Sequence, residues 1–288
     1  MIQAELGAAP SQTDAMLHVR NLSRVYGRGC TTCLTVGALP PDSNVCQRCS
    51  AVIAVNNISF DLGQGEVLGI MGESGSGKST LVRLLYFDEP PTAGRAIFRQ
   101  AGQRHDLFAL NAAQQRALRN HHFGMVYQNP QLGLNFGWSV SGNIAERLLM
   151  SGTDNYAAIR RRAGTLLERM SVPVERMDVR PGTFSGGMQQ RVQIARARAP
   201  DPPLLFLDEV TTGLDLTVQA KILDLILELQ HDLKIAMIVV THDLGVVRLL
   251  TTRTLVMRFG RIVEAGLTDQ ILEDPQHPYT QALVSSAL

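Results

Sequence analysis

Residues 72–79, Gly-Glu-Ser-Gly-Ser-Gly-Lys-Ser, have the composition and spacing of a phosphate-binding loop. Glycines allow backbone N–H groups to converge on phosphate oxygens, and a helix that starts after them adds its positive end. Lys78 supplies a charge for the β- and γ-phosphates, and the Ser79 hydroxyl can ligate Mg²⁺. A glycine-rich turn can be merely structural, but Lys-Ser at this position favours nucleotide binding. The predicted contacts are Gly72, Glu73, Ser74, Gly75, Ser76, Gly77, Lys78, Ser79 and Thr80.

A second group of acidic residues follows the apolar run Leu-Leu-Phe-Leu at 204–207. A buried strand that ends in Asp208 carries a carboxylate toward Mg²⁺, and Glu209 can polarise the attacking water as a general base. Many strands end in an acidic turn, so this pattern alone is weak. Combined with the phosphate-binding loop, it predicts hydrolysis of a nucleoside triphosphate.

The hydrophobic pattern supplies the elements that must position these groups. Alternating residues predict a strand at 17–26, and a short apolar run predicts a buried strand immediately before the phosphate-binding loop. Residues 204–210 and 235–241 are continuous apolar runs, as expected for a parallel sheet covered on both faces. Helical periodicity fills 138–182 and 187–198, and 253–266 predicts a hairpin with Gly260 and Arg261 in its turn. The pattern predicts an α/β phosphate-binding core with helices inserted between about 130 and 182.

Composition excludes several classes of protein. The chain has 288 residues, 45% of them hydrophobic, and its 27 Lys and Arg nearly balance 26 Asp and Glu. Such a balance does not favour nucleic acid as a partner. No apolar stretch approaches the length of a membrane-spanning helix, and residues 1–15 read as a polar, mobile tail rather than a secretory signal. We therefore predict a cytoplasmic protein.

Further motifs follow in a fixed order. Residues 183–191 read Thr-Phe-Ser-Gly-Gly-Met-Gln-Gln-Arg, about twenty residues before the Asp-Glu strand. This segment resembles the signature of the ABC superfamily of ATPases. By the same resemblance, Gln128 corresponds to the glutamine of the family's Q-loop, Asp215 to the aspartate of its D-loop and His242 to its switch histidine. Tyr26 lies where the family uses an aromatic residue to stack on adenine, although it could equally be a packing residue.

The resemblance implies a RecA-like core, an antiparallel β subdomain and a helical subdomain, all within one ABC ATPase domain over 16–288. It also implies a head-to-tail homodimer that binds and hydrolyses Mg·ATP. Each ATP would contact Lys78, Ser79, Asp208, Glu209 and His242 of one subunit, with Gln128 joining Ser79 and Asp208 around Mg²⁺. Ser185, Gly186 and Gly187 would come from the partner subunit. The family usually has proline after Asp-Glu, where this chain has Val210; we expect activity to survive this change.

Longer segments narrow the resemblance. Residues 142–149, 241–257 and 266–288 resemble the ATP-binding subunits of bacterial carbon–phosphorus lyase systems, which act in phosphonate catabolism and dock on the lyase core subunits. The alternative is the ATP-binding subunit of a peptide or nickel importer, which would act with a membrane permease at the inner membrane. ATPases of translation or DNA repair are less similar, because the chain has neither a second cassette nor a long coiled coil. Trp138 lies where a partner docks in ABC proteins, although the sequence is equally consistent with a tryptophan packed in the core.

All four cysteines lie in a segment without periodicity at 27–50. Cys30 and Cys33 form one C-x-x-C pair, and Cys46 and Cys49 form another, which suits tetrahedral Zn²⁺. Four unligated thiols and an iron–sulfur cluster are the alternatives. We predict a structural zinc knuckle that either shapes the adenine side of the site through Tyr26 or offers a docking surface. The segment is an insertion relative to the lyase family, and four cysteine ligands leave no open position for catalysis.

Overall fold

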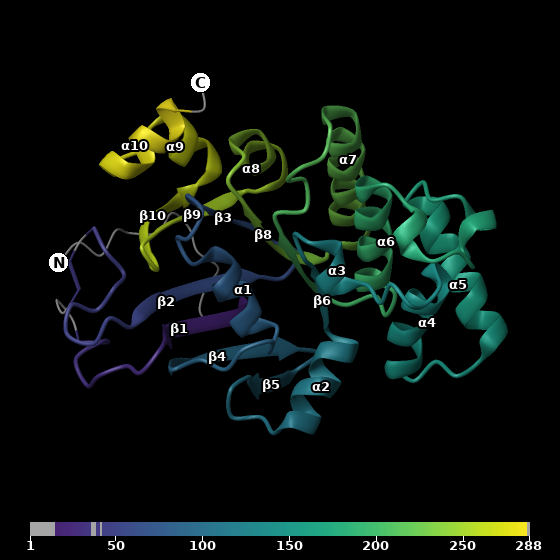
Figure 1. Ribbon diagram of the computed structural model, residues 1–288, viewed down its shortest axis with the longest axis horizontal. Coiled ribbons are helices and arrows are strands. Elements are labelled where there is room, and N and C mark those ends of the chain that lie inside the picture. The colour runs from purple at the N-terminus through teal and green to yellow at the C-terminus, as the bar shows by residue number, and fades with distance from the viewer. Residues whose placement is uncertain (1–14, 36–38, 41, 287–288) are drawn as a thin grey trace. The chain divides into compact units, whose positions relative to one another are not determined.

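The computed structural model describes residues 15–35, 39–40 and 42–286. The predicted N-terminal tail therefore lies outside the described residues, except for Ala15, which begins strand β1 (Ala15–Tyr26). Two compact units make up the chain: Met1–Asn111 together with Val239–Leu288, and Ala112–Ile238. We call them unit 1 and unit 2, and their elements are labelled in Figure 1.

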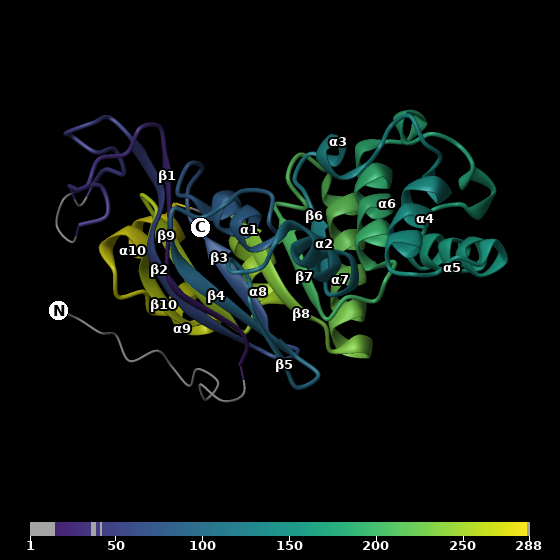
Figure 2. The same ribbon diagram turned by 90° about the horizontal axis from the view of Figure 1, so that it is seen from below.

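Unit 1 contains a four-stranded antiparallel sheet (Figure 2). Strand β1 pairs on one side with β2 and on the other with β4, which in turn pairs with β5. The apolar residues Leu17, Val19 and Leu22 of β1 are fully buried, which explains why this segment forms an inner strand. The predicted strand at 17–26 and the predicted antiparallel subdomain are confirmed. The other strands are β2 (Val52–Gly63), β4 (Ala93–Gln100) and β5 (Gln103–Asp106).

The same unit holds the strand that leads into the phosphate-binding loop. Strand β3 (Val67–Met71) is buried at every residue and pairs in parallel with β9 (Arg253–Arg258), which pairs antiparallel with β10 (Arg261–Leu267). The predicted hairpin is confirmed, but its turn was wrongly placed. Phe259 and Gly260 form the turn, because both have positive φ (49° and 76°), as a tight two-residue hairpin requires. The helices of unit 1 are α1 (Lys78–Leu85), α8 (Leu244–Leu250), α9 (Thr268–Glu273) and α10 (Pro278–Ser285).

Unit 2 is mostly helical around two parallel strands, β6 (Phe123–Val126) and β7 (Leu204–Asp208). Every residue of both strands is buried, as expected for a parallel pair covered on both faces. The helices predicted between 138 and 182 and at 187–198 are present. The helices of unit 2 are α2 (Ala112–His121), α3 (Pro130–Gly133), α4 (Val140–Met150), α5 (Tyr156–Arg169), α6 (Gly186–Arg198) and α7 (Leu216–Leu233), with 3₁₀ turns at Val174–Arg176 and Pro181–Thr183.

Strand β8 (Ala236–Thr241) contains the boundary between the two units. All six of its residues are buried, which confirms the strand predicted from the apolar run at 235–241. Strands β3, β7 and β8 are each followed directly by residues predicted to contact nucleotide. The sequence therefore places its chemistry at the carboxyl ends of buried strands, where α/β proteins bind ligands.

Candidate nucleotide-binding site

The phosphate-binding loop runs from the end of β3 to the first turn of α1, as its motif requires. Gly77 caps α1 with φ of 101°, a conformation that favours glycine. A Cβ atom at this position would lie 2.0 Å from the backbone oxygen of Ala54, so no side chain fits there. The loop passes so close to β2 that its shape is set by backbone contact.

The loop folds around the ammonium group of Lys78. The Nζ atom donates to the backbone oxygens of Gly72 at 2.7 Å and Glu73 at 2.9 Å, and Lys78 is only 4% exposed. The Ser76 hydroxyl is buried and makes no hydrogen bond among the described residues. A buried cation and an unpartnered hydroxyl within a loop that turns around them fit an anionic phosphate group.

Two further contacts hold the loop from outside. The Tyr279 hydroxyl in α10 accepts a hydrogen bond of 3.0 Å from the backbone N–H of Glu73. The backbone N–H of Gly260, in the β9–β10 turn, donates to the Ser76 carbonyl oxygen at 3.0 Å. We did not predict either contact from sequence, because neither partner lies near the motif and neither residue type is distinctive.

Tyr26 is the last residue of β1 and lies beside the start of α1. Its hydroxyl donates to Glu89 Oε2 at 2.5 Å and also interacts with the side chain of Thr80. Burial raises the pKa of Tyr26, and the hydrogen bond with Glu89 adds to the rise. The guanidinium carbon of Arg24 lies 4.8 Å from the centre of the ring. The ring therefore has a fixed orientation next to the phosphate-binding loop, and its stacking on adenine stays a prediction.

Unit 2 brings Gln128 and Glu209 together. The Gln128 side-chain amide donates to Glu209 Oε2 at 3.0 Å, and the Thr212 hydroxyl donates to the same oxygen at 3.3 Å. Asp208, at the end of β7, is 1% exposed, and Glu209 next to it has φ of 47°. Such a backbone conformation is uncommon outside glycine and is often found at functional sites. Sequence analysis did not identify Thr212 as a partner of this carboxylate.

The residues of the signature form the start of α6. Ser185 is the N-cap, and its hydroxyl accepts a hydrogen bond from the backbone N–H of Met188 at 3.4 Å. Ser185 and Gly186 are exposed, and Gly187 is buried. Asp215 caps α7 in a similar way, since it accepts from the Val218 N–H at 3.0 Å. These caps give Ser185 and Asp215 structural roles, while an exposed helix start can still receive an anion.

His242 belongs to unit 1 and is exposed. It lies between the end of β8 and Asp243, whose side chain accepts from the N–H groups of Gly245 and Val246 and so caps α8. Unit 1 thus contains Tyr26, the phosphate-binding loop and His242, and unit 2 contains Gln128, the signature, Asp208, Glu209 and Asp215. Their roles at the nucleotide stay predictions. Trp138 is 46% exposed, which excludes the core-packing reading.

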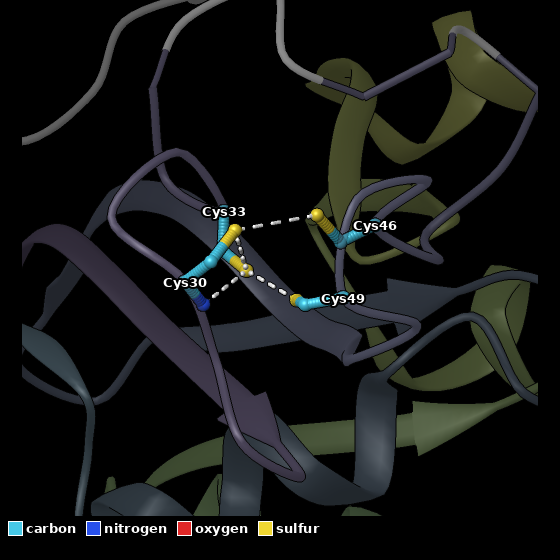
Figure 3. Close-up of side chains that lie close together, drawn as sticks. All are labelled: Cys30, Cys33, Cys46 and Cys49. Carbon is cyan, nitrogen blue, oxygen red and sulfur yellow. Dashed lines mark hydrogen bonds between the residues drawn. The ribbon is translucent and has the colours of Figure 1, made fainter.

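The four cysteines form one cluster in unit 1 (Figure 3). The sulfur of Cys30 lies 3.6 Å from that of Cys33 and 3.8 Å from that of Cys46, and Cys33 and Cys49 are 3.4 Å apart. All four sulfur atoms lie within 4.8 Å of one another, too far apart for disulfides. A hydrogen bond with the Thr32 hydroxyl lowers the pKa of Cys30 to about 6. The arrangement is able to hold a metal ion.

The fold and these motifs define a class of ATP-hydrolysing proteins. The family model for the ABC transporter matches residues 55–212, and the chain belongs to this family. It is an ABC-type ATP hydrolase that uses ATP and Mg²⁺. The described residues include no helix long and apolar enough to cross a membrane.

Individual relatives refine this assignment. The chain is 49% identical over 233 residues to the "Putative phosphonates utilization ATP-binding protein PhnK" of Escherichia coli K12. The aligned region covers 81% of this chain and 91% of PhnK. It is 40% identical to the oligopeptide transport ATP-binding protein OppD of Bacillus subtilis, over 82% of this chain and 66% of OppD. The ATP-binding cassette MJ0796, solved as a dimer in a post-hydrolysis state with ADP and Pi, matches with a TM-score of 0.74 and 26% identity over 88% of this chain and 99% of that structure.

Proposed function

We propose that the chain hydrolyses ATP at two composite sites in a head-to-tail homodimer and that this activity supports phosphonate catabolism. Lys78 and the N–H groups of the phosphate-binding loop would hold the β- and γ-phosphates, and Tyr26 would stack on adenine. Ser185, Gly186 and Gly187 of the partner subunit would close on the γ-phosphate. The dimeric MJ0796 cassette with ADP and Pi supports this arrangement.

The oxygen donors of the site fit Mg²⁺. Ser79, Asp208 and Gln128 offer a hydroxyl, a carboxylate and an amide oxygen, which are the ligands that this hard cation prefers. When bound, Mg²⁺ neutralises charge that develops on the transferred phosphoryl group. The buried position of Asp208 at the end of β7 favours its use as a metal ligand rather than as a surface acid.

Proton transfer is assigned to Glu209. Its carboxylate would accept the proton of the attacking water, while Gln128 and Thr212 hold that carboxylate through their hydrogen bonds to Oε2. His242 would donate to the γ-phosphate as charge develops there. The observation that supports this assignment is the 3.0 Å hydrogen bond between Gln128 and Glu209, which joins the proposed base to a proposed ligand of Mg²⁺.

The Glu209→Gln variant tests the assignment. We expect it to lower the rate of ATP hydrolysis about 10²- to 10⁴-fold while ATP still binds, because only the proton acceptor is lost. Glu228→Gln, an exposed glutamate of α7, is the matched control and should hydrolyse ATP as the wild type does. A Glu209→Gln protein with normal hydrolysis would overturn the role of Glu209.

The proposed partners are the core subunits of a carbon–phosphorus lyase. The carrying observation is the 49% identity to PhnK over most of both chains, against 40% to OppD. The exposed Trp138 and Leu132 of unit 2 lie in the segment where such a partner would dock. The Glu209→Gln protein with ATP should trap the closed dimer, and the lyase subunits should co-purify with it. Recovery of a membrane permease instead would favour a peptide-type importer, as the OppD match suggests.

The domain plan belongs to the same proposal. One ABC ATPase domain would span 16–288, with a helical subdomain at about 130–182 and the cysteine loop at 27–50 as an insertion. The protein would act in the cytoplasm, or at the inner membrane if its partner is a permease. The near balance of 27 basic and 26 acidic residues supports protein partners rather than nucleic acid.

The cysteine cluster is proposed to hold one structural Zn²⁺. Zinc–sulfur bonds of about 2.3 Å in a tetrahedron place the sulfur atoms about 3.8 Å apart. Three sulfur–sulfur distances of 3.4 to 3.8 Å agree with one ion better than with a multi-iron cluster. Elemental analysis of the purified chain should find one zinc per chain. Iron together with absorbance in the visible range would favour the iron–sulfur cluster instead. Absence of any metal would favour four unligated thiols.

A further inference from the structure

The cysteine cluster forms the outer end of the β1–β2 pair. Buried Cys33 and Cys46 pack with Leu39, Ala51 and Ile53. The Cys46 N–H donates to the Ala51 carbonyl at 2.9 Å, and the Ile53 N–H donates to the Asn44 carbonyl at 2.7 Å. The loop therefore folds back onto the beginning of β2, and an ion at its centre would fix the chain on both sides of the strand pair.

One route leads from this cluster to Tyr26. In the β1–β2 register, Val25 lies opposite Ile53 and Tyr26 opposite Val52. The Val25 side chain packs against the cysteine cluster, and Cys30 follows shortly after Tyr26 along the chain. An ion bound by both C-x-x-C pairs would link the end of β1 to the beginning of β2, next to Tyr26, the residue proposed to stack on adenine.

A second route leads to the phosphate-binding loop. The Arg261 guanidinium donates to the carbonyl oxygens of Leu39 and Pro40, at 3.5 and 3.3 Å, within the cysteine loop. Its neighbour Gly260 donates its N–H to the Ser76 carbonyl at 3.0 Å and accepts a hydrogen bond of 2.8 Å from Asn56. Arg261, the first residue of β10, thus contacts the cysteine loop, and Gly260 of the preceding turn contacts the phosphate-binding loop.

We propose that the metal-bound cysteine loop is a positioning element for ATP, which acts through Val25 on Tyr26 and through Arg261 and Gly260 on the phosphate-binding loop. This inference rests on the proposed metal and on the proposed role of Tyr26. In the metal-free loop the four thiols are not linked to one another, so only hydrogen bonds and apolar packing keep Leu39 and Pro40 beside Arg261. Metal and ATP therefore favour the same conformation of unit 1. Each ligand must increase the affinity for the other by the same factor.

A cavity of about 370 Å³ reaches Cys30 and Cys33 from the side of Gly27 and Thr92. Cys30 is partly exposed and Cys33 is buried, so the cavity brings solvent to the edge of the cluster at Cys30. This partly exposed edge makes removal and return of the ion a practical titration.

The test compares ATP binding to the full chain loaded with Zn²⁺ and to the chain emptied by a chelator selective for zinc over magnesium, with Mg²⁺ supplied to both. The dissociation constant for ATP should rise about tenfold on metal removal. Mg·ATP should in turn raise the affinity for zinc by the same factor, measured at equilibrium in competition with the chelator. Arg261→Gln keeps all four sulfur ligands but removes the hydrogen bonds to Leu39 and Pro40. This variant should still bind one zinc, and its affinity for ATP should change less when the metal is removed.

Arg95→Gln, an exposed arginine of β4, is the matched control and should behave as the wild type. A chain that never binds zinc would contradict the proposed metal site itself. A chain that binds one zinc but has the same affinity for ATP with and without it would overturn the positioning role alone. If metal removal unfolds unit 1, ATP binding is compared instead between the zinc-loaded Arg261→Gln and Arg95→Gln variants. Weaker ATP binding by Arg261→Gln alone supports the proposal. Equal ATP binding by the two variants overturns it.

Discussion

The phosphate-binding loop and the cysteine loop are both irregular segments of unit 1, yet they keep their shapes by different means. Backbone contacts define the first: a Cβ on Gly77 would meet the Ala54 oxygen at 2.0 Å, and one on Gly72 would meet the Met257 oxygen at 2.2 Å. Side-chain sulfur atoms define the second, with nearest distances of 3.4 to 3.8 Å. The first loop is preorganised by the fold, whereas we propose that the second is held by a bound ion. Three experiments would break or sharpen this contrast.

The largest effect is expected from Gly77→Ala. The added methyl group clashes with a backbone oxygen of β2, and the positive φ adds strain of about 1 to 2 kcal/mol. We expect ATP binding to weaken about 100-fold or more, since each 1.4 kcal/mol changes the constant tenfold. Gly102→Ala is the control, because Gly102 has φ of 78° and nothing within 4 Å. That variant should lose some stability but no ATP affinity. If the two variants weakened ATP binding equally, backbone contact would not be what shapes the phosphate-binding loop.

A smaller effect is expected when the metal is removed and trypsin is added. Arg28 and Arg48 are exposed trypsin sites inside the cysteine loop. Cleavage there requires local opening, so its rate should rise on the order of tenfold in the metal-free chain. Cleavage after Arg161, an exposed residue of α5 far along the sequence, should keep its rate. The contrast between the loops would fail if the cysteine loop resisted trypsin equally well without metal.

The smallest effect is expected at Tyr26, which lies between the two loops. Tyr26→Leu removes the aromatic face and should weaken nucleotide binding about fivefold, which corresponds to about 1 kcal/mol, the lower end of the contribution of stacking on a base. Tyr26→Phe keeps the ring and loses only the hydrogen bond to Glu89, so its dissociation constant should stay within about twofold of wild type. Stacking does not read base edges, so ATP and GTP should weaken alike. A loss for ATP alone would point to direct recognition of adenine.

Local patterns in the sequence were sufficient to predict the strands and motifs of the phosphate-binding loop. Its glycines, Lys78 and the apolar strand before it are contiguous, so the prediction needed no knowledge of distant contacts. The buried strands β7 and β8 were equally clear, because continuous apolar runs of this length have few alternatives. The two C-x-x-C pairs were informative for the same reason: the spacing itself implies a common centre.

Elements with mixed patterns were not predicted. The segment 93–126, which forms β4, β5, α2 and β6, alternates short polar and apolar stretches and contains no motif. Its strands are recognisable only through their pairing, as when β4 meets β1. The hairpin turn was misplaced by one residue because Phe259 adopts a positive φ that its side chain does not suggest. The contacts of Tyr279 and Gly260 with the phosphate-binding loop depend on distant parts of the chain, which a local pattern does not encode.

The hydrogen bond between Glu73 and Tyr279 joins residues 206 positions apart, and Gly72 packs beside the Met257 carbonyl. During synthesis, the phosphate-binding loop therefore emerges long before the residues that complete it. A nascent chain lacks both contacts until its last helices have been made, and pairings this distant form slowly. The order of synthesis thus delays completion of the ATP-binding loop until nearly the whole cassette is available, so a truncated chain should not acquire a fully formed loop.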